Sequence, residues 1–333
     1  MAENSGFHAA ELRRELTLRS RRYAKGRRHV ESYGGSPVIV FAPEGEQHGN
    51  FFDAAYAAIL QRPEWLRRFD KVHAQARRSL PKAERRWREL DSSMSSDALL
   101  MNIFCAPGVV ESRAVQDALG VDAAATPVFG WKARVPLKNG AFDRTEVDLR
   151  LGSLLVEAKL TEGDFQSCFA EVVELYRDFD EVFDRELLPR EEIVVSRRRE
   201  ATEFPEDYSQ EYEEPVETTL FDAPARPLIA DVVRGYASYQ LIRNVLAAHA
   251  AGASFCVILD ERRPDLREAW FLVMAAVRSA ALRVRLKTLT WQELAALLSE
   301  ELREFLDVKY GIVGPGRMAL PIDDTGEFQE ERP

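Results

Sequence analysis

The sequence predicts an α/β fold in which helices flank a central mixed sheet. Two alternating apolar and polar runs, 146–151 and 154–160, surround Gly152-Ser153, which is typical of a β-hairpin. The segment 254–260 is a near-continuous apolar run, as expected of a buried strand. Helical patterns lie before, between and after these strands, so the sheet should be covered by helices.

The N-terminal part predicts an α-helical section, residues 1–94. We expect a helix at 9–25, an extended run at 37–43, a helix at 50–61, and further helical segments at 64–72 and 81–90. Ser95 should then cap an amphipathic helix, 95–104, and a second helix, 109–119, should stop at Gly120.

The central part predicts a three-stranded antiparallel meander, in which strand 127–136 precedes the hairpin. Beyond it we expect helices at 165–187 and 231–251, the second capped by Asp231. A helix at 264–280, an alternating strand at 282–288 and a helix opened by a capping box at Thr290 and Glu293 follow. The expected domain is 95–313, with an insertion at about 188–228 and a tail at 314–333.

Composition limits the function. The chain of 333 residues carries a net charge of −10, yet segments 13–28 and 67–88 are basic and 200–222 is acidic. Each basic run either meets phosphates or is a solvated helix face. The chain shows no membrane-length apolar run, and its N-terminal stretch lacks the apolar core expected of a signal peptide. Its three cysteines and five histidines lack metal-ligand spacing. We expect a cytoplasmic protein.

The hairpin carries the charged side chains that could take part in catalysis or metal binding. Glu157 and Lys159 lie two apart and share a strand face. On the first strand the polar face is Glu146, Asp148 and Arg150, and the apolar face is Val147, Leu149 and Leu151. If the polar faces coincide, Asp148, Glu157 and Lys159 are neighbours. Carboxylates suit Mg²⁺, and a lysine beside them can orient water or offset charge on a phosphoryl group.

Other interpretations of this motif are open. The hairpin could lie on the surface, with an ion pair of little energetic value. Glu, Ala, Lys and Leu are also good helix formers, although Gly152-Ser153 and the alternation oppose a helix.

Asp148 followed by Glu157-Ala158-Lys159 across a hairpin resembles the PD-(D/E)xK nuclease superfamily. The resemblance implies a restriction-endonuclease-like αβββαβ core and Mg²⁺-dependent hydrolysis of DNA, with Mn²⁺ able to substitute. Asp148, Glu157 and the carbonyl of Ala158 would bind the metal, and Lys159 would assist the water. The proline usual before the first acid is absent, because Val147 stands there.

The string SSDALLMNIF, 95–104, resembles the PGN_0703-like branch of restriction endonucleases. In such folds a helix before the sheet often supplies another acid. Glu111 is the acid that we expect there, with Glu89, Asp97 and Asp117 as alternatives. Glu111 could instead be an acid at a helix N-terminus, stabilised by the helix dipole. Gln240 shares a helix face with Asn244. It would contact nucleic acid or an attacking water; alternatively, this helix face is hydrogen-bonded to neighbouring backbone.

The resemblance implies a nuclease with DNA as its partner. We expect a homodimer and a role in restriction, phage defence or repair. Two alternatives remain at this point: an inactive nucleic-acid-binding module of the same fold, and a protein-interaction domain favoured by the acidic balance.

Overall fold

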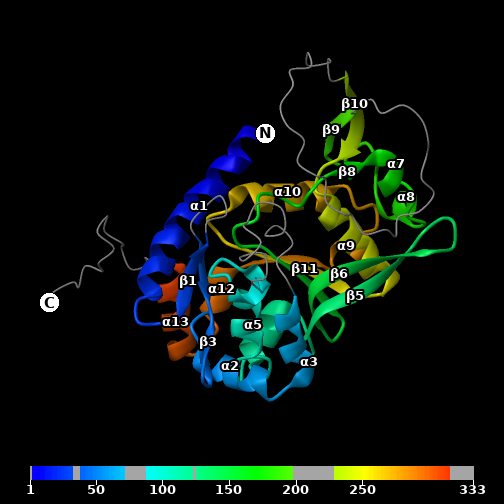
Figure 1. Cartoon of the computed structure of the whole chain (residues 1–333). Coiled ribbons are helices and arrows are strands. Elements are labelled where there is room, and N and C mark those ends of the chain that lie inside the picture. Colours follow the sequence, from blue (N-terminus) through cyan, green and yellow to red (C-terminus); the bar gives the residue numbers. More distant parts are fainter. Residues whose placement is uncertain (1, 33–37, 72–87, 123–124, 198–228, 316–333) are drawn as a thin grey trace, which may run out of the picture.

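The computed structural model describes residues 2–32, 38–71, 88–122, 125–197 and 229–315 (Figure 1). Its helices are α1 (Ala2–Tyr23), α2 (Asp53–Leu60), α3 (Pro63–Leu66), η1 (Arg67–Asp70), η2 (Glu89–Asp91), α5 (Ser96–Phe104), α6 (Arg113–Leu119), α7 (Ala170–Val173), α8 (Phe179–Val182), α9 (Tyr239–Ala250), α10 (Pro264–Ala275), α11 (Ala280–Arg283), α12 (Trp291–Ala295) and α13 (Glu300–Tyr310). Its strands are β1 (His29–Ser32), β2 (Val38–Phe41), β3 (Pro43–Glu44), β4 (Gln47–His48), β5 (Val128–Pro136), β6 (Phe142–Leu151), β7 (Leu154–Ala158), β8 (Cys168–Phe169), β9 (Arg190–Arg197), β10 (Ile229–Tyr236), β11 (Ser254–Leu259) and β12 (Leu286–Thr290).

The central sheet is mixed and has the strand order β12-β11-β7-β6-β5. Strands β5, β6 and β7 form an antiparallel meander, whereas β11 pairs in parallel with both β7 and β12. The meander and the buried strand expected from the sequence are therefore confirmed.

Helices cover both faces of this sheet (Figure 1). One hydrophobic cluster joins the sheet to α5, α12, α13 and the N-terminal section. A second cluster joins the other face to α9, α10, α7 and α8. The first cluster contains Leu16 together with Leu99, so the N-terminal section shares a core with the rest of the chain.

Helix α5 begins where the sequence predicts it, because the Ser95 hydroxyl accepts a hydrogen bond from the Ala98 N–H at 3.1 Å. All nine residues of α5 are buried, however, so the helix is not amphipathic. The N-terminal section and the sheet cover it from both sides. The Thr290–Glu293 capping box is also confirmed, and it opens the short helix α12.

The single helix expected at 165–187 is wrong. The chain instead forms β8, α7 and α8, because its backbone bonds to neighbours distant in sequence. Phe169 pairs with Gly235 of β10, and the Arg177 N–H donates to the Pro136 carbonyl. The helix expected from Asp231 is also wrong in its first part, where β10 pairs with β9 along eight residues and α9 begins only at Tyr239. Long-range pairing thus overrides local helical pattern.

The N-terminal section is not wholly helical, since β1 pairs with β2 and β3 with β4 in two small antiparallel sheets. Helix α1 is longer than expected and packs against α13 and α10. Near the C-terminus the expected strand 282–288 is shifted, because α11 takes its first residues and β12 begins at Leu286. The expected helix to residue 308 is divided into α12 and α13.

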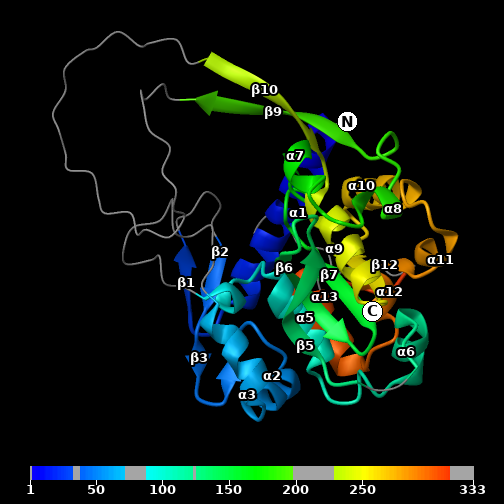
Figure 2. The same cartoon turned by 90° about the vertical axis from the view of Figure 1, so that its right-hand side faces the viewer.

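The antiparallel pair β9 and β10 extends away from the body of the molecule (Figure 2). The expected insertion at 188–228 includes β9, but 198–228 lie outside the described residues, as do the acidic segment 200–222 and most of the expected tail. Within the described ranges, no helix has both the length and the apolar character needed to cross a bilayer.

Candidate active site

The register of the β6–β7 pair brings Asp148 beside the strand that carries Glu157. Leu149 pairs with Val156 in the last step of the register, so Asp148 comes directly after that pair on β6 and Glu157 directly after it on β7. The Ala158 N–H donates to Asp148 Oδ2 at 2.8 Å. This hydrogen bond ties the acid of one strand to the backbone of the other.

Lys159, Glu157 and α9 form a closed polar network. Lys159 Nζ donates to Glu157 Oε1 and to Gln240 Oε1, each at 2.8 Å. Asn244 Nδ2 donates to Glu157 Oε2 at 2.8 Å. Glu157 is fully buried and Lys159 is 6% exposed. Both oxygens of the Glu157 carboxylate therefore have hydrogen-bond partners within the protein, away from water. Asn244, which the sequence placed on the same face as Gln240, takes a direct part.

The alternation of β6 breaks at Asp148. Val147 packs in the cluster that contains α9, whereas Leu149 packs in the cluster that contains α5. The sequence expectation that these two residues share a face is therefore wrong. Gly130, which lies opposite Asp148 in the β5–β6 register, has φ +62°. This left-handed conformation interrupts the ladder between β5 and β6, so the alternation of side chains between the two faces of the sheet is broken at Asp148.

The charges within the network act on one another. Burial, then the carboxylates of Glu157 and Asp97, raise the pKa of Asp148 well above its usual range. Burial acts to lower the pKa of Lys159, but the carboxylates of Glu157, Glu162 and Asp148 outweigh it and raise that pKa above its usual value. Lys159 therefore stays an ammonium while Asp148 resists ionisation.

Asp97, in the first turn of α5, is the helix acid whose charge acts on Asp148. Its Oδ2 accepts from Arg68 Nη2 at 2.7 Å and from Lys71 Nζ at 3.1 Å. Arg68 Nη1 also bonds Glu146 Oε1 at 2.7 Å. Burial acts to raise the pKa of Asp97, but Arg68 and Lys71 lower it. Two cations from the N-terminal section thus hold Asp97 as a carboxylate.

A second carboxylate, Glu162, joins α5 to the end of β7. Its Oε1 accepts from the Ser96 hydroxyl and its Oε2 from the Leu160 N–H, each at 2.6 Å. The guanidinium of the fully buried Arg263 donates to the Glu162 carbonyl at 2.6 Å and to the Gly163 carbonyl at 3.0 Å. The loop after Lys159 is therefore fixed from two sides. No sequence pattern pointed to Glu162 or Arg263, because their partners come from separate segments.

The structure does not bring Glu111 to this cluster. Glu111 is exposed in the turn before α6, and no contact among the described residues joins it to Asp148, Glu157 or Lys159. Of the alternatives weighed from the sequence, Asp117 pairs with Arg113 on the surface, and Glu89 pairs with Lys71 at 3.0 Å.

The donor set is consistent with a hard divalent cation. Burial and the repulsion between Asp148 and Glu157 both raise the pKa of Asp148, and a cation held by these carboxylates would offset the repulsion. Among the described residues, no group of three or more His, Cys, Asp and Glu side chains is arranged to hold a metal ion. Two carboxylates and a backbone carbonyl suit Mg²⁺, which keeps several of its waters.

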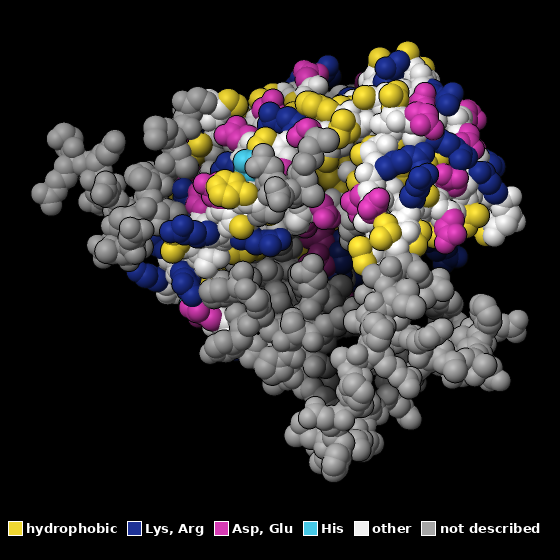
Figure 3. Space-filling model, turned by 90° about the horizontal axis from the view of Figure 1, so that it is seen from above, with side chains coloured by type: hydrophobic (Ala, Val, Ile, Leu, Met, Phe, Trp, Pro, Cys, Tyr) yellow, Lys and Arg dark blue, Asp and Glu magenta, His cyan; other side chains and the backbone are white. Residues whose placement is uncertain are grey.

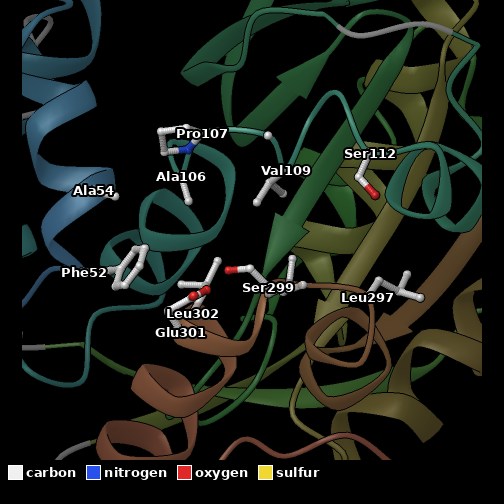
Figure 4. A pocket seen from close by; sticks show the side chains of 12 residues that line it. Phe52, Ala54, Ala106, Pro107, Val109, Ser112, Leu297, Ser299, Glu301 and Leu302 are labelled. Atoms are coloured by element: carbon white, nitrogen blue, oxygen red, sulfur yellow. The ribbon is translucent and has the colours of Figure 1, made fainter.

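Two cavities lie elsewhere. A cavity of about 570 Å³ between the turn after α5 and the α12–α13 connection is mainly apolar (Figure 4). Another of about 430 Å³ lies beside β3, β4 and the end of α1. Neither is lined by Asp148, Glu157 or Lys159. The polar network is therefore distinct from these cavities.

The surface seen from above is of mixed charge (Figure 3). Asp and Glu side chains appear in a recess near the middle of this face, and Lys and Arg side chains lie on both sides of it. The net charge of −10 therefore does not describe every surface of the molecule.

Comparison with known proteins adds a family to this geometry. The chain matches no curated protein and no solved structure. Residues 18–311 match the family model described as "Restriction Endonuclease associating with ARP". The match spans most of the chain and includes α5, the meander, α9 and β11. The protein belongs to this family of restriction endonucleases associating with ARP.

Proposed function

We propose that the protein is a metal-dependent nuclease of the PD-(D/E)xK type that hydrolyses phosphodiester bonds in DNA. One observation carries the proposal: Lys159 bridges Glu157 and Gln240 in a buried network beside Asp148, in a chain of a restriction endonuclease family. Helix α5, strands β5 to β7, α9 and β11 would form the αβββαβ core, with β8 to β10 as an insertion.

Asp148, Glu157 and the Ala158 carbonyl would hold Mg²⁺ or Mn²⁺, which when bound supplies Lewis acidity and an activated water. Asp97 rather than Glu111 is the helix acid that we assign to the site, because its charge reaches Asp148. It would act on the bound cation through its charge or through a water.

The residues of the chain have separate roles in this proposal. Lys159, kept protonated by its carboxylate neighbours, offsets negative charge on the attacked phosphate and orients the water. Gln240 fixes the Lys159 side chain, and Asn244 fixes Glu157. Because these hydrogen bonds already hold Lys159 and Glu157 in place, little reorganisation is needed when negative charge develops on the attacked phosphate.

The decisive experiment is cleavage of circular, linear and single-stranded DNA by the full chain with Mg²⁺, Mn²⁺ or EDTA. We expect cleavage with either metal and none with EDTA. Lys159→Ala should lower the rate by about 10²-fold or more while DNA affinity in EDTA is retained.

Metal-independent cleavage, or equal rates for the wild type and Lys159→Ala, would contradict the proposal. DNA binding without cleavage by the wild type under any of these conditions would favour an inactive binding module of the same fold.

A further inference from the structure

The outer face of the β5–β6 hairpin carries a basic group that the proposed active site does not use. Cross-strand pairing places Arg134 opposite Arg144, Lys132 opposite Glu146, and Pro136 opposite Phe142. These side chains share one face, because residues directly opposite in a ladder point to the same side. We define Lys132, Arg134, Phe142 and Arg144 as the basic hairpin face. All four are exposed.

The cations of this face have no acidic partner in the part of the chain that the structure describes. Among the described residues, Lys132, Arg134 and Arg144 form no ion pair, and the one Glu on the same face, Glu146, is engaged by Arg68 and Lys71. The Arg134 guanidinium lies 4.2 Å from the centroid of the Phe142 ring. Like charges directly opposite on a ladder destabilise it, so the Arg134–Arg144 pair is unfavourable in the free protein.

The face lies on the same strand as Asp148. The hairpin extends at the right of Figure 1 and ends the sheet, because β5 is an edge strand. Arg144 precedes Asp148 by four residues on β6, which is roughly 13 Å along a strand. Glu146, with Arg68 and Asp97, lies between them. DNA whose cut phosphate lies beside Asp148 would therefore reach Arg144 along β6, past Glu146 and its partner Arg68.

We propose that the basic hairpin face binds the phosphate backbone of duplex DNA beside the bond that is cut. Arg134 and Arg144 each neutralise a phosphate, and the flat guanidinium of Arg134 is pre-oriented by Phe142. The position of this face beside the cut bond rests on the proposed function. The binding of DNA by this face does not, and it can be measured without cleavage.

A different explanation is that these charges only protect the edge strand from pairing with another sheet. That role would leave DNA affinity unchanged when the charges are removed, so binding measurements separate the two explanations.

The experiment measures the affinity of the full chain for one short duplex in EDTA over a series of salt concentrations. The test variant is Arg134→Gln/Arg144→Gln. The matched control, Arg113→Gln/Arg283→Gln, removes two exposed arginines near β12, at the opposite edge of the sheet. Circular dichroism and thermal unfolding check that every variant is folded.

We expect the test variant to bind more weakly and its slope of log affinity against log salt to be smaller by about 2, because each neutralised phosphate contributes about 0.9. The control should keep the wild-type slope. A second variant, Arg134→Lys/Arg144→Lys, retains both charges and should restore most of the slope. If the Gln variant keeps the wild-type affinity and slope, the inference is overturned.

The outcomes also separate this inference from the proposed function. Cleavage by the wild type together with an unchanged slope in the Gln variant overturns the hairpin face alone. A reduced slope together with no metal-dependent cleavage overturns the nuclease and supports the hairpin face. Absence of both DNA binding and cleavage by the wild type overturns both, and cleavage without binding in EDTA overturns the hairpin face alone.

Discussion

Asp148 on β6 and Ala158 on β7 are joined by a hydrogen bond of 2.8 Å, from the Ala158 N–H to Asp148 Oδ2. The bond lies just beyond the last backbone pair of the two strands, Leu149 with Val156. It keeps one acid beside Glu157 although the two carboxylates repel one another, and burial together with this repulsion raises the pKa of Asp148.

Asp148→Asn keeps an acceptor for the Ala158 N–H but removes the charge. We expect it to abolish metal-dependent cleavage and the rise in melting temperature that Mg²⁺ gives to the wild type. In the metal-free protein the pKa of Asp148 is higher in the folded state than in the unfolded state. Between these two pKa values the folded state therefore binds more protons than the unfolded state. Wild-type stability should therefore fall as pH rises through that window, and the fall should be smaller in Asp148→Asn.

Thermal unfolding from acidic to neutral pH, with and without Mg²⁺, checks both parts. An identical pH dependence in the two proteins would refute the raised pKa of Asp148, and an undiminished Mg²⁺ effect in the variant would refute metal binding by Asp148.

Asp97→Asn tests the assignment of the helix acid. Its loss should lower the rate or the apparent Mg²⁺ affinity by about 10- to 100-fold, the usual effect of removing a group that supports a metal site. Glu111→Gln should leave both unchanged, because Glu111 is exposed in the turn before α6. Rates measured over a range of Mg²⁺ concentrations decide this, and the reverse result would restore Glu111 as the helix acid.

Gly130→Ala tests the break in the sheet opposite Asp148. A Cβ at Gly130 would lie 2.3 Å from Arg68 Nη1, and the backbone there has φ +62°. Gly140, at φ +84°, has open space around its Cβ position, so Gly140→Ala isolates the backbone cost of about 1–2 kcal/mol. Gly130→Ala should be the more destabilising of the two in urea unfolding, since Arg68 must move away from Asp97 and Glu146. Equal effects would show that the contact with Arg68 has no energetic weight.

Lys309→Met tests a lysine that is buried without a carboxylate partner in the described part of the chain. Lys309 Nζ lies 2.7 Å from both the Asn50 carbonyl oxygen and the Tyr310 hydroxyl oxygen. Burial, with a smaller effect of Arg27, lowers the pKa of Lys309 well below its usual value. Below about pH 10.5 the unfolded chain therefore binds a proton that the folded chain loses first, so stability rises with pH.

The free energy of unfolding in urea should rise less steeply with pH in Lys309→Met than in the wild type. Lys138→Met, which removes an exposed lysine at the tip of the β5–β6 hairpin, is the control and should keep the wild-type slope. A slope unchanged in Lys309→Met would mean that Lys309 is charged when folded.

Local pattern determined much of this fold. The alternation around Gly152-Ser153 defined the β6–β7 hairpin, the apolar run defined β11, and Ser95 and Thr290 defined the starts of α5 and α12. These signals succeed because they depend on neighbours within a few residues. The same alternation indicated that Asp148, Glu157 and Lys159 could meet, and the spacing on α9 indicated that Gln240 and Asn244 share a face.

Only the tertiary structure decided the rest. The helix expected at 165–187 is replaced by short elements because its backbone pairs with β10, about 66 residues away. Asp97, buried in the first turn of α5, acts on Asp148 through its charge, whereas Glu111 is exposed, and only the folded structure distinguishes the two acids. Arg68, Lys71 and Glu162 reach the site from separate segments, and such charge pairs leave no periodic trace in a sequence. Helix caps and strand alternation are local in the chain, whereas buried electrostatics depends on what folding brings together.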